Sequence, residues 1–266
     1  QSDGLLQPMT LMFEIRGIGG YEMEARSMEL YDDMVRVIEE QKLPYELPFD
    51  RVGYAPWIIN TPPAGTAVVQ ATHIYRMNIL DPVHLTEGTI DARRQAHEMT
   101  EIFSHIKGME GVQLSATAPA IGIREGRRIL GEYYLDFENL LEGSAFADAI
   151  AFCGYPVDVH EPAPGAGKTK QPVRKGKPYE IPYRSLLPKD VDGLILAGRL
   201  ISGSTIAHAS YRVTGTAMAM GQAAGLAAAW AVTENISVKK VPGDMLRRVL
   251  AERGVEFLDS RDTGEG

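Results

Sequence analysis

A mixed α/β fold is predicted for this chain of 266 residues, and three stretches predict it. Residues 194–197 form a short apolar run between two glycines, which is typical of a buried strand in a parallel sheet. In residues 214–232 nearly every side chain is small or apolar, which favours a helix buried on most sides. Residues 86–107 carry apolar side chains at steps of three and four, as an amphipathic helix does.

The other elements are predicted from the same periodicities, taken in chain order. Strand-forming runs occur at residues 9–15, 66–78 and 112–118, with a weaker one at 133–137. Helical patterns occur at residues 22–41 and 242–253, with a short one at 146–152. Pro and Gly predict irregular structure at residues 53–63 and 156–178, and a loop is expected between residues 198 and 214. Thr86 is expected to cap the 86–107 helix.

The start of the 214–232 helix is the most informative local feature. Thr214, Gly215 and Thr216 provide a hydroxyl cap and a glycine at which a ligand can approach the backbone. The N–H groups of a first helical turn have no partner inside the helix, and the macrodipole places partial positive charge there. This end therefore favours an electron-rich group.

Composition limits the class of protein. The net charge of −8 argues against nucleic acid or an anionic membrane as a partner. Cys153 is the single cysteine, which excludes an internal disulfide framework and a Cys-rich metal site and agrees with a cytoplasmic location, which we expect. The apolar run of the 214–232 helix is shorter than the roughly 20 residues that a bilayer requires, so no membrane span is predicted.

Familiar nucleotide and metal motifs are incomplete in this sequence. Residues 165–169 resemble the end of a phosphate-binding loop, but Pro162 occupies the place of its first glycine. Gly17 and Gly19 begin a dinucleotide fingerprint whose third glycine is replaced by Glu22. His97 and Glu98 lack the second histidine of a zinc helix, so they are interpreted as a solvated face and no metal site is predicted.

A hydrolase is weighed because His208 lies between two serines. Ser204 and Ser210 flank it, but the strand-turn-helix elbow sequence of serine hydrolases is absent. This reading ranks third among the functions considered.

Arginines gather around the apolar segments. An arginine fork matches carboxylate and phosphate groups, while ion pairs with the abundant Asp and Glu are the competing structural explanation. The arginines concerned are Arg124, Arg127, Arg128, Arg184, Arg199 and Arg212. At least one of them is expected to contact a bound anion or cofactor.

Four segments together resemble a known family. They are IGIREGRRILGEYYLDFENLLEG at residues 121–143, DAIAFCGYPVDVHEP at 148–162, YEIPYRSLLPKDVDGLILAGRLIS at 179–202 and AHASYRVTGTAMAMGQAAGLAAA at 207–229. In this combination and order the chain resembles FAD-dependent oxidoreductases related to the fumarate reductase flavoproteins.

The resemblance implies a FAD-binding domain that is split in sequence and Rossmann-like. Residues 1–190 would form a substrate or cap domain, 191–235 the closing strand and helix of the FAD domain, and 236–266 a C-terminal helix and tail. FAD contacts are then expected from Ala197, Gly198, Arg199, Thr214, Gly215, Thr216, Ala217 and Met218. Roles in orienting a polar or anionic substrate or in passing a proton are expected for Arg124, Arg128, His208 and Arg212.

The sequence departs from the family pattern at three places. The N-terminal FAD-binding unit with its GxGxxG is missing, so this chain alone is expected to be inactive and to bind FAD poorly or not at all. Leu200 stands where relatives often have cysteine, which excludes a redox-active thiol there. Ile206 stands where an acidic residue commonly precedes the Ala-His pair, which weakens an acid-assisted role for His208.

Two functions remain from different classes. The first is the C-terminal part of an FAD-dependent oxidoreductase that moves a hydride between flavin and a small organic substrate. The second is a non-catalytic binding or assembly module without flavin, in which the apolar helix is core and the arginines are structural. A homo-oligomer is left open.

Overall fold

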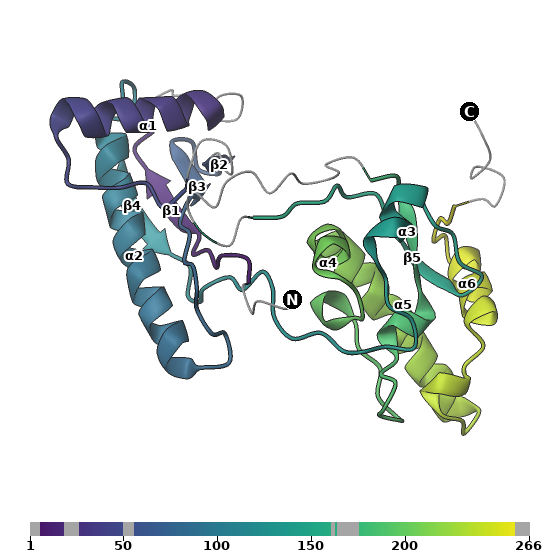
Figure 1. Ribbon diagram of the computed structural model, residues 1–266. Coiled ribbons are helices and arrows are strands. Elements are labelled where there is room, and N and C mark those ends of the chain that lie inside the picture. Colours follow the sequence, from purple (N-terminus) through teal and green to yellow (C-terminus); the bar gives the residue numbers. More distant parts are fainter. Residues whose placement is uncertain (1–5, 19–26, 50–55, 161–162, 164–175, 259–266) are drawn as a thin grey trace. The chain divides into compact units, whose positions relative to one another are not determined.

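The computed structural model describes residues 6–18, 27–49, 56–160, 163 and 176–258. The chain forms two compact units, each made from two segments of sequence (Figure 1). The first unit takes in Gln1–Glu125 and His160–Lys170, and the second takes in Gly126–Val159 and Gln171–Gly266. Each unit buries its own apolar core, as separate domains do.

The first unit is built on a four-stranded antiparallel sheet with the order β2-β3-β1-β4. Its strands are β1 Phe13–Arg16, β2 Trp57–Thr61, β3 Thr66–Gln70 and β4 Gln113–Thr117. Phe13 and Ile15 lie opposite Val69 and Ala67, and all four side chains are buried. One face of the sheet is therefore apolar, as in antiparallel sheets that are covered on one side.

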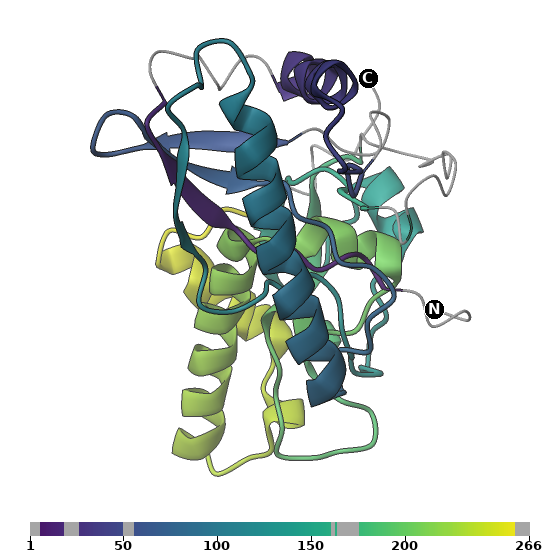
Figure 2. The same cartoon turned by 90° about the vertical axis from the view of Figure 1, so that its left-hand side faces the viewer.

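Two helices complete this unit. They are α1 Ser27–Gln41 and α2 Pro82–Ser104. Figure 2 shows α2 lying over the strands, and its Ala96, Met99 and Phe103 share one core with the buried strand residues. The helical part of the 22–41 prediction that the structure describes is confirmed, and residues 22–26 lie outside the described residues.

The N-terminus of α2 corrects the predicted cap at Thr86. Asp81 is the N-cap, and its carboxylate accepts a hydrogen bond from the Val83 N–H at 2.9 Å. Pro82 then occupies the first helical position, where its missing N–H has no cost. Thr86 lies one turn inside the helix and donates its hydroxyl to the Pro82 carbonyl.

Strand boundaries in the first unit differ from the predictions in three places. Strand β1 begins at Phe13 rather than at residue 9. Strand β2 lies within residues 53–63, which were expected to be irregular. Only Ile58 of β2 is buried, because β2 is an edge strand, so its sequence lacks a clear alternation. Strand β3 ends at Gln70 rather than near residue 78.

The second unit surrounds an antiparallel hairpin. Its strands are β5 Ala149–Cys153 and β6 Tyr179–Pro182. Its helices are α3 Phe137–Glu142, α4 Thr205–Tyr211, α5 Thr214–Thr233 and α6 Gly243–Glu252, with short 3-10 turns η1 Tyr183–Leu186, η2 Gly198–Leu200 and η3 Val238–Lys240. Helices α5 and α6 both contact β5, and the prediction of α6 is confirmed.

Three predictions in the second unit are wrong. Residues 146–152 contain strand β5 rather than a short helix. Residues 133–137 form no strand beyond an isolated bridge from Leu135 to Gly203, because the chain turns into α3, whose N-cap Asp136 and Asn139 form a capping box. The expected loop after residue 198 contains α4.

The predicted parallel strand at residues 194–197 is also wrong for the described chain. The segment is extended, but its Leu196 N–H bonds singly to the Leu186 carbonyl at 3.0 Å. A strand requires a ladder of such bonds, and no neighbouring strand of the described chain supplies it here. Leu194 remains 43 % exposed, so the segment is not buried either.

Helix α5 is buried on one face only, which corrects the prediction of a helix buried on most sides. Met220, Ala223 and Ala227 are fully buried, whereas Met218 is 70 % and Val232 82 % exposed. Among the described helices, none has the length and apolarity needed to cross a membrane.

The fold is thus of mixed α/β class with small antiparallel sheets, as predicted at that level. The Rossmann-like closing segment and the division at residues 190 and 235 stay predictions. The chain passes between the two compact units after residues 125, 159 and 170.

Candidate functional site

The junction between α4 and α5 gathers most of the predicted site residues. Ser204 caps α4, and its hydroxyl accepts a hydrogen bond from the Ala207 N–H at 3.2 Å. Arg212 is the C-cap of α4, and Val213 is already the N-cap of α5. Chain continuity therefore fixes His208 within two turns of the start of α5.

His208 is fully buried in the last turns of α4, with an exposed fraction of 0 %. Its ring meets the ring of Tyr211 edge-on, with centroids 5.5 Å apart. Neither Nδ1 nor Nε2 has a hydrogen-bond partner among the residues that the structure describes. A buried imidazole in this state loses hydrogen bonds that water would give it, which is the usual signature of a position that works on a ligand or a bound water.

Positive charge surrounds this imidazole. The Arg128 Nε–H donates to the Gly203 carbonyl at 3.0 Å, and its Nη2 donates to the Thr205 hydroxyl at 3.2 Å, which fixes the guanidinium at the start of α4. Burial lowers the pKa of His208 to about 3, and three positive charges add to that effect, those of Arg128, Arg212 and Arg199. The imidazole is consequently neutral at physiological pH.

Arg212 is anchored by Asp158, two residues before the first unit's second segment begins at His160. Its Nη2 donates to the Asp158 carboxylate and to the Asp158 carbonyl, each at 2.9 Å. The arginine side chain is 12 % exposed and the aspartate 41 %. The pair holds the guanidinium rigidly beside α4 while solvent reaches the carboxylate.

The two serines beside His208 do not form a nucleophile pair with it. The Ser204 hydroxyl caps α4, and the Ser210 hydroxyl donates to the Tyr155 carbonyl at 2.6 Å. Since the imidazole has no hydrogen-bond partner in the described part of the chain, the serine–histidine contact of a hydrolase is not formed.

Gly198 brings the segment before α4 against the start of α5. It has a φ of +76°, which favours glycine, and a Cβ built on it would lie 3.6 Å from the Ala217 Cβ. The segment Ala197–Arg199 is therefore adjacent to the first turn of α5. The prediction that both segments contact FAD requires this proximity.

The first turn of α5 is not capped by a hydroxyl, which corrects the predicted cap at Thr214–Thr216. Val213 is the N-cap, and no side chain of the described residues caps this end. The first intrahelical bond runs from the Ala217 N–H to the Val213 carbonyl at 3.0 Å. The N–H groups of Thr214, Gly215 and Thr216 precede that bond, so the helix itself does not use them.

The side chains of this turn leave the backbone accessible. Thr214 and Gly215 are exposed, Thr216 is buried, and Met218 is 70 % exposed. A Cβ on Gly215 would meet nothing within 4 Å. A ligand can reach these N–H groups from solvent.

Arg124 lies in the first unit, apart from the group around His208. It is 8 % exposed, and its Nη1 donates to the Pro8 carbonyl and to the Thr10 hydroxyl, each at 2.6 Å. These contacts tie two segments of the first unit together.

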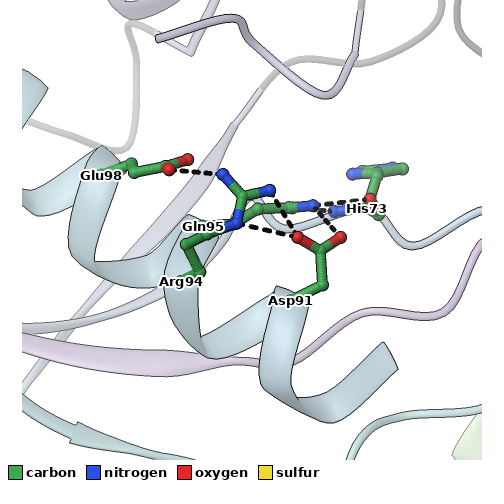
Figure 3. Close-up of polar contacts among 5 residues, drawn as sticks. All are labelled: His73, Asp91, Arg94, Gln95 and Glu98. Carbon is green, nitrogen blue, oxygen red and sulfur yellow. Dashed lines mark hydrogen bonds and ion pairs between the residues drawn. The ribbon is translucent and has the colours of Figure 1, made fainter. Parts of the chain in front are cut away.

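The first unit has its own buried polar group around His73. Figure 3 shows Gln95 of α2 joining both backbone groups of His73: its Oε1 accepts from the N–H at 3.0 Å and its Nε2 donates to the carbonyl at 3.1 Å. On the outer side Arg94 pairs with Asp91 and Glu98. Burial lowers the pKa of His73 well below its ordinary value, and the charge of Arg124 lowers it further.

The predicted solvated helix face carries His97, which is exposed, and Glu98, which pairs with Arg94. Within the described ranges no three His, Cys, Asp or Glu side chains gather as metal ligands do. The loop-like motif at 165–169 and the end of the Gly17 motif lie outside the described residues.

Comparison with protein families decides the class. A family model of FAD dependent oxidoreductases matches residues 1–250. The chain belongs to this family. Searches of curated proteins and of solved structures return no match. The prediction of an FAD-linked oxidoreductase is confirmed at this level.

The residues of this FAD dependent oxidoreductase fit a flavin at the start of α5. A reduced flavin carries negative charge near N1 and its C2 carbonyl, and an uncapped helix N-terminus is complementary to that charge. The open space at Gly215 and the glycine turn at Gly198 leave the backbone accessible to a flat ring.

Sequence reasoning missed two residues of the oxidoreductase that the structure places at this junction. Asp158 holds Arg212, and Cys153 accepts a hydrogen bond from the Thr216 hydroxyl in the first turn of α5. Asp158 and Cys153 follow or end a strand that was predicted as a helix, so their side chains could not be placed. The short, apolar Ala149–Cys153 run bounded by Gly154 was the available signal.

Proposed function

We propose that this chain forms the flavin-closing and substrate-facing part of an FAD-dependent oxidoreductase that transfers a hydride between flavin and a small organic substrate. The observation that carries the proposal is the uncapped first turn of α5 beside the Gly198 turn, reached directly from the helix that buries His208. Membership of the family supports FAD as the cofactor, and the geometry supports a flavin position at the start of α5.

The proposed contacts to the cofactor come from backbone groups of α5. The N–H groups of Thr214, Gly215 and Thr216 stabilise negative charge on the pyrimidine part of the ring. Ala197, Gly198 and Arg199 border the same space, with Ala217 and Met218 as the following side chains of the helix. The flavin, when bound, supplies the atom that accepts or gives the hydride.

On the substrate side His208 works as a neutral imidazole. Either ring nitrogen is able to donate or accept a hydrogen bond, because neither is used within the described chain. Arg128 and Arg212 provide the positive charge that orients a polar or anionic substrate and favours a neutral histidine. We assign Arg124 a structural role in the first unit rather than a place beside them, because its guanidinium bonds the Pro8 carbonyl.

The exposed face of α5 supports a docking role as well. Gly221 and Gly225 have open space in place of a Cβ, and Met218 and Val232 are exposed on the same helix. The family uses FAD, yet this sequence contains no complete GxGxxG. We propose that a dinucleotide-binding unit, as in the fumarate reductase flavoproteins, packs on this face and supplies the contacts to the ADP half of FAD.

Titration of the purified chain with FAD tests whether this chain needs the proposed dinucleotide-binding unit in order to bind FAD. The chain alone is expected to bind FAD weakly, while the protein produced from the gene with its upstream coding region is expected to be yellow with one flavin per chain. Tight, stoichiometric FAD binding by the chain alone would contradict the proposed missing unit.

The alternative is a binding or assembly module without flavin, favoured by the same exposed apolar face of α5. Reduction of the flavin in the longer protein by a substrate supports the enzyme, and a colourless longer protein supports the module. Size-exclusion chromatography with light scattering on the chain tells whether a second copy covers the face instead.

A further inference from the structure

Cys153 lies in a buried group of hydrogen-bonding side chains beneath the start of α5. It is the last residue of β5 and is 1 % exposed. The hydroxyl of Thr216, in the first turn of α5, donates to the Cys153 Sγ at 3.6 Å. The Ser210 Oγ, in the last turn of α4, lies 3.6 Å from the same sulfur.

The donors and acceptors of this group run in one direction. The Ser210 hydroxyl donates to the Tyr155 carbonyl at 2.6 Å, so its oxygen remains to accept from the thiol. The chain of bonds is then Thr216 O–H to sulfur, thiol S–H to Ser210, and Ser210 O–H to Tyr155. It links α5 to α4 and both to the segment after β5.

Tyr179 closes the group from the neighbouring strand. It lies opposite Cys153 in the hairpin register and is 1 % exposed. Burial raises the pKa of its hydroxyl, and the nearby Cys153 raises it further. The core beneath the start of α5 therefore contains a thiol and hydroxyl groups, although the strand that forms it is otherwise apolar.

The N-terminus of α5 is uncapped because its N-cap residue, Val213, has no side-chain oxygen to accept from the first-turn N–H groups. The Thr216 hydroxyl in the same turn points inward and donates to the Cys153 sulfur. This bond fixes the first turn of α5 against the end of β5.

We propose that Cys153 is a positioning residue: its thiol holds α4 and the first turn of α5 in one register and so fixes the position of the helix end that faces the flavin. The part that concerns flavin rests on the proposed function, while the part that concerns register does not. Cys153→Ala removes both the acceptor and the donor, whereas Cys153→Ser keeps both.

Amide hydrogen exchange on the purified chain tests the register. Cys153→Ala and Thr216→Val are each expected to accelerate exchange at Ala217 and Met218, the first hydrogen-bonded amides of α5, by about five- to tenfold, the effect of one lost hydrogen bond. The double variant is expected to add nothing further, and Cys153→Ser to restore most of the protection. Thr233→Val, which removes a hydroxyl bonded to Ala229 at the other end of α5, is the matched control.

Unchanged exchange at Ala217 and Met218 in both Cys153→Ala and Thr216→Val overturns the proposal. The flavin part is measured in the longer protein, where Cys153→Ala is expected to weaken FAD binding about tenfold and to shift the flavin midpoint potential, with recovery in Cys153→Ser. Altered exchange with unchanged FAD binding and potential overturns the flavin part alone. A longer protein that binds no flavin refutes the proposed function, and the exchange result still decides the register.

Discussion

Gly198 and Ala217 lie against each other across the start of α5, with 3.6 Å between the Ala217 Cβ and the position that a Cβ on Gly198 would take. The contact joins the turn before α4 to the helix after it. Gly198 also has a φ of +76°, so this position requires a residue that adopts a left-handed backbone next to a close neighbour. The predicted cofactor contacts are brought together by this pair.

Gly198→Ala is expected to lower the free energy of unfolding by about 1–2 kcal/mol, the cost of a left-handed conformation for an L-residue. The 3.6 Å separation is ordinary contact, so sterics add little. Gly193→Ala is the control, since Gly193 has a φ of +69° and nothing within 4 Å of its Cβ. Urea denaturation should show similar losses for both, and only Gly198→Ala should weaken FAD binding in the longer protein. Equal FAD affinities in the two variants would remove Gly198 from the site.

Gly215→Asp is expected to change stability and flavin binding in opposite directions. A carboxylate in the first turn of α5 favours the helix by about 0.3–1 kcal/mol through the macrodipole, and Gly215 has room for it. The same negative charge would occupy the place proposed for the flavin, so FAD binding should be lost. Gln41→Asp adds an equal charge at an exposed position at the end of α1 and should leave FAD binding intact. Unimpaired FAD binding by Gly215→Asp contradicts the proposed site.

Elements of this fold that depend on local sequence pattern could be predicted, and elements that depend on distant parts of the chain could not. Helix α6 and most of α2 were predicted because a periodic apolar face is a local property. Strand β5 and the 194–197 segment were not, because whether a short apolar run becomes helix, strand or extended loop depends on partners distant in sequence. Helix α4, which carries His208, was hidden by its seven-residue length.

The same holds for the candidate site: residues within one local motif were predicted, and their partners from distant segments were not. The motif around residues 207–218 located His208 and the α5 start, but the partners Asp158 and Cys153 come from another segment of the chain and were not found. Arg124 and Arg128 are four residues apart and were grouped together, yet they fall in different compact units. The unit boundary passes between them, which their short separation in sequence did not indicate.

Gly221→Ala is expected to stabilise the chain by about 0.5–1 kcal/mol, because alanine favours a helix interior over glycine and the position has open space. If a dinucleotide-binding unit packs on this face, the added methyl group interferes with close approach in the longer protein. Thermal unfolding of both forms makes the comparison. A gain in the longer protein equal to that in the chain would show that nothing approaches Gly221 closely.

Gly17→Ala is expected to be far more damaging than Gly65→Ala, although both glycines have similar φ values of +82° and +81°. A Cβ on Gly17 would lie 2.2 Å from the Gly111 carbonyl oxygen, whereas the nearest atom to a Cβ on Gly65 is 3.7 Å away. Gly65→Ala should cost about 1–2 kcal/mol for its backbone conformation. Gly17→Ala should cost at least about 1–3 kcal/mol more, since backbone must move. Equal unfolding free energies for the two variants would contradict the close approach of Gly17 to Gly111.

His208 is expected to make stability depend on pH. Its folded pKa of about 3 lies below the ordinary value of 6.5, because burial and three arginines disfavour the imidazolium. Between pH 3 and 6.5 the unfolded chain binds a proton that the folded chain does not, so the contribution of His208 is fully present above pH 6.5 and is lost as the pH falls, by up to about 1.4 kcal/mol per pH unit.

His208→Gln should therefore flatten the pH dependence of the unfolding free energy between pH 6.5 and 4, measured by urea denaturation at each pH. His73 contributes in the same direction, since its pKa is also lowered, so the difference between wild type and variant isolates His208. His97→Gln, at an exposed position of α2, is the control and should keep the wild-type slope. Arg212→Gln should raise the pKa of His208 in an NMR titration, because it removes one of the charges that lower it. An unchanged slope in His208→Gln would mean that the imidazole accepts a proton in the folded state, and the neutral-histidine mechanism would then be excluded.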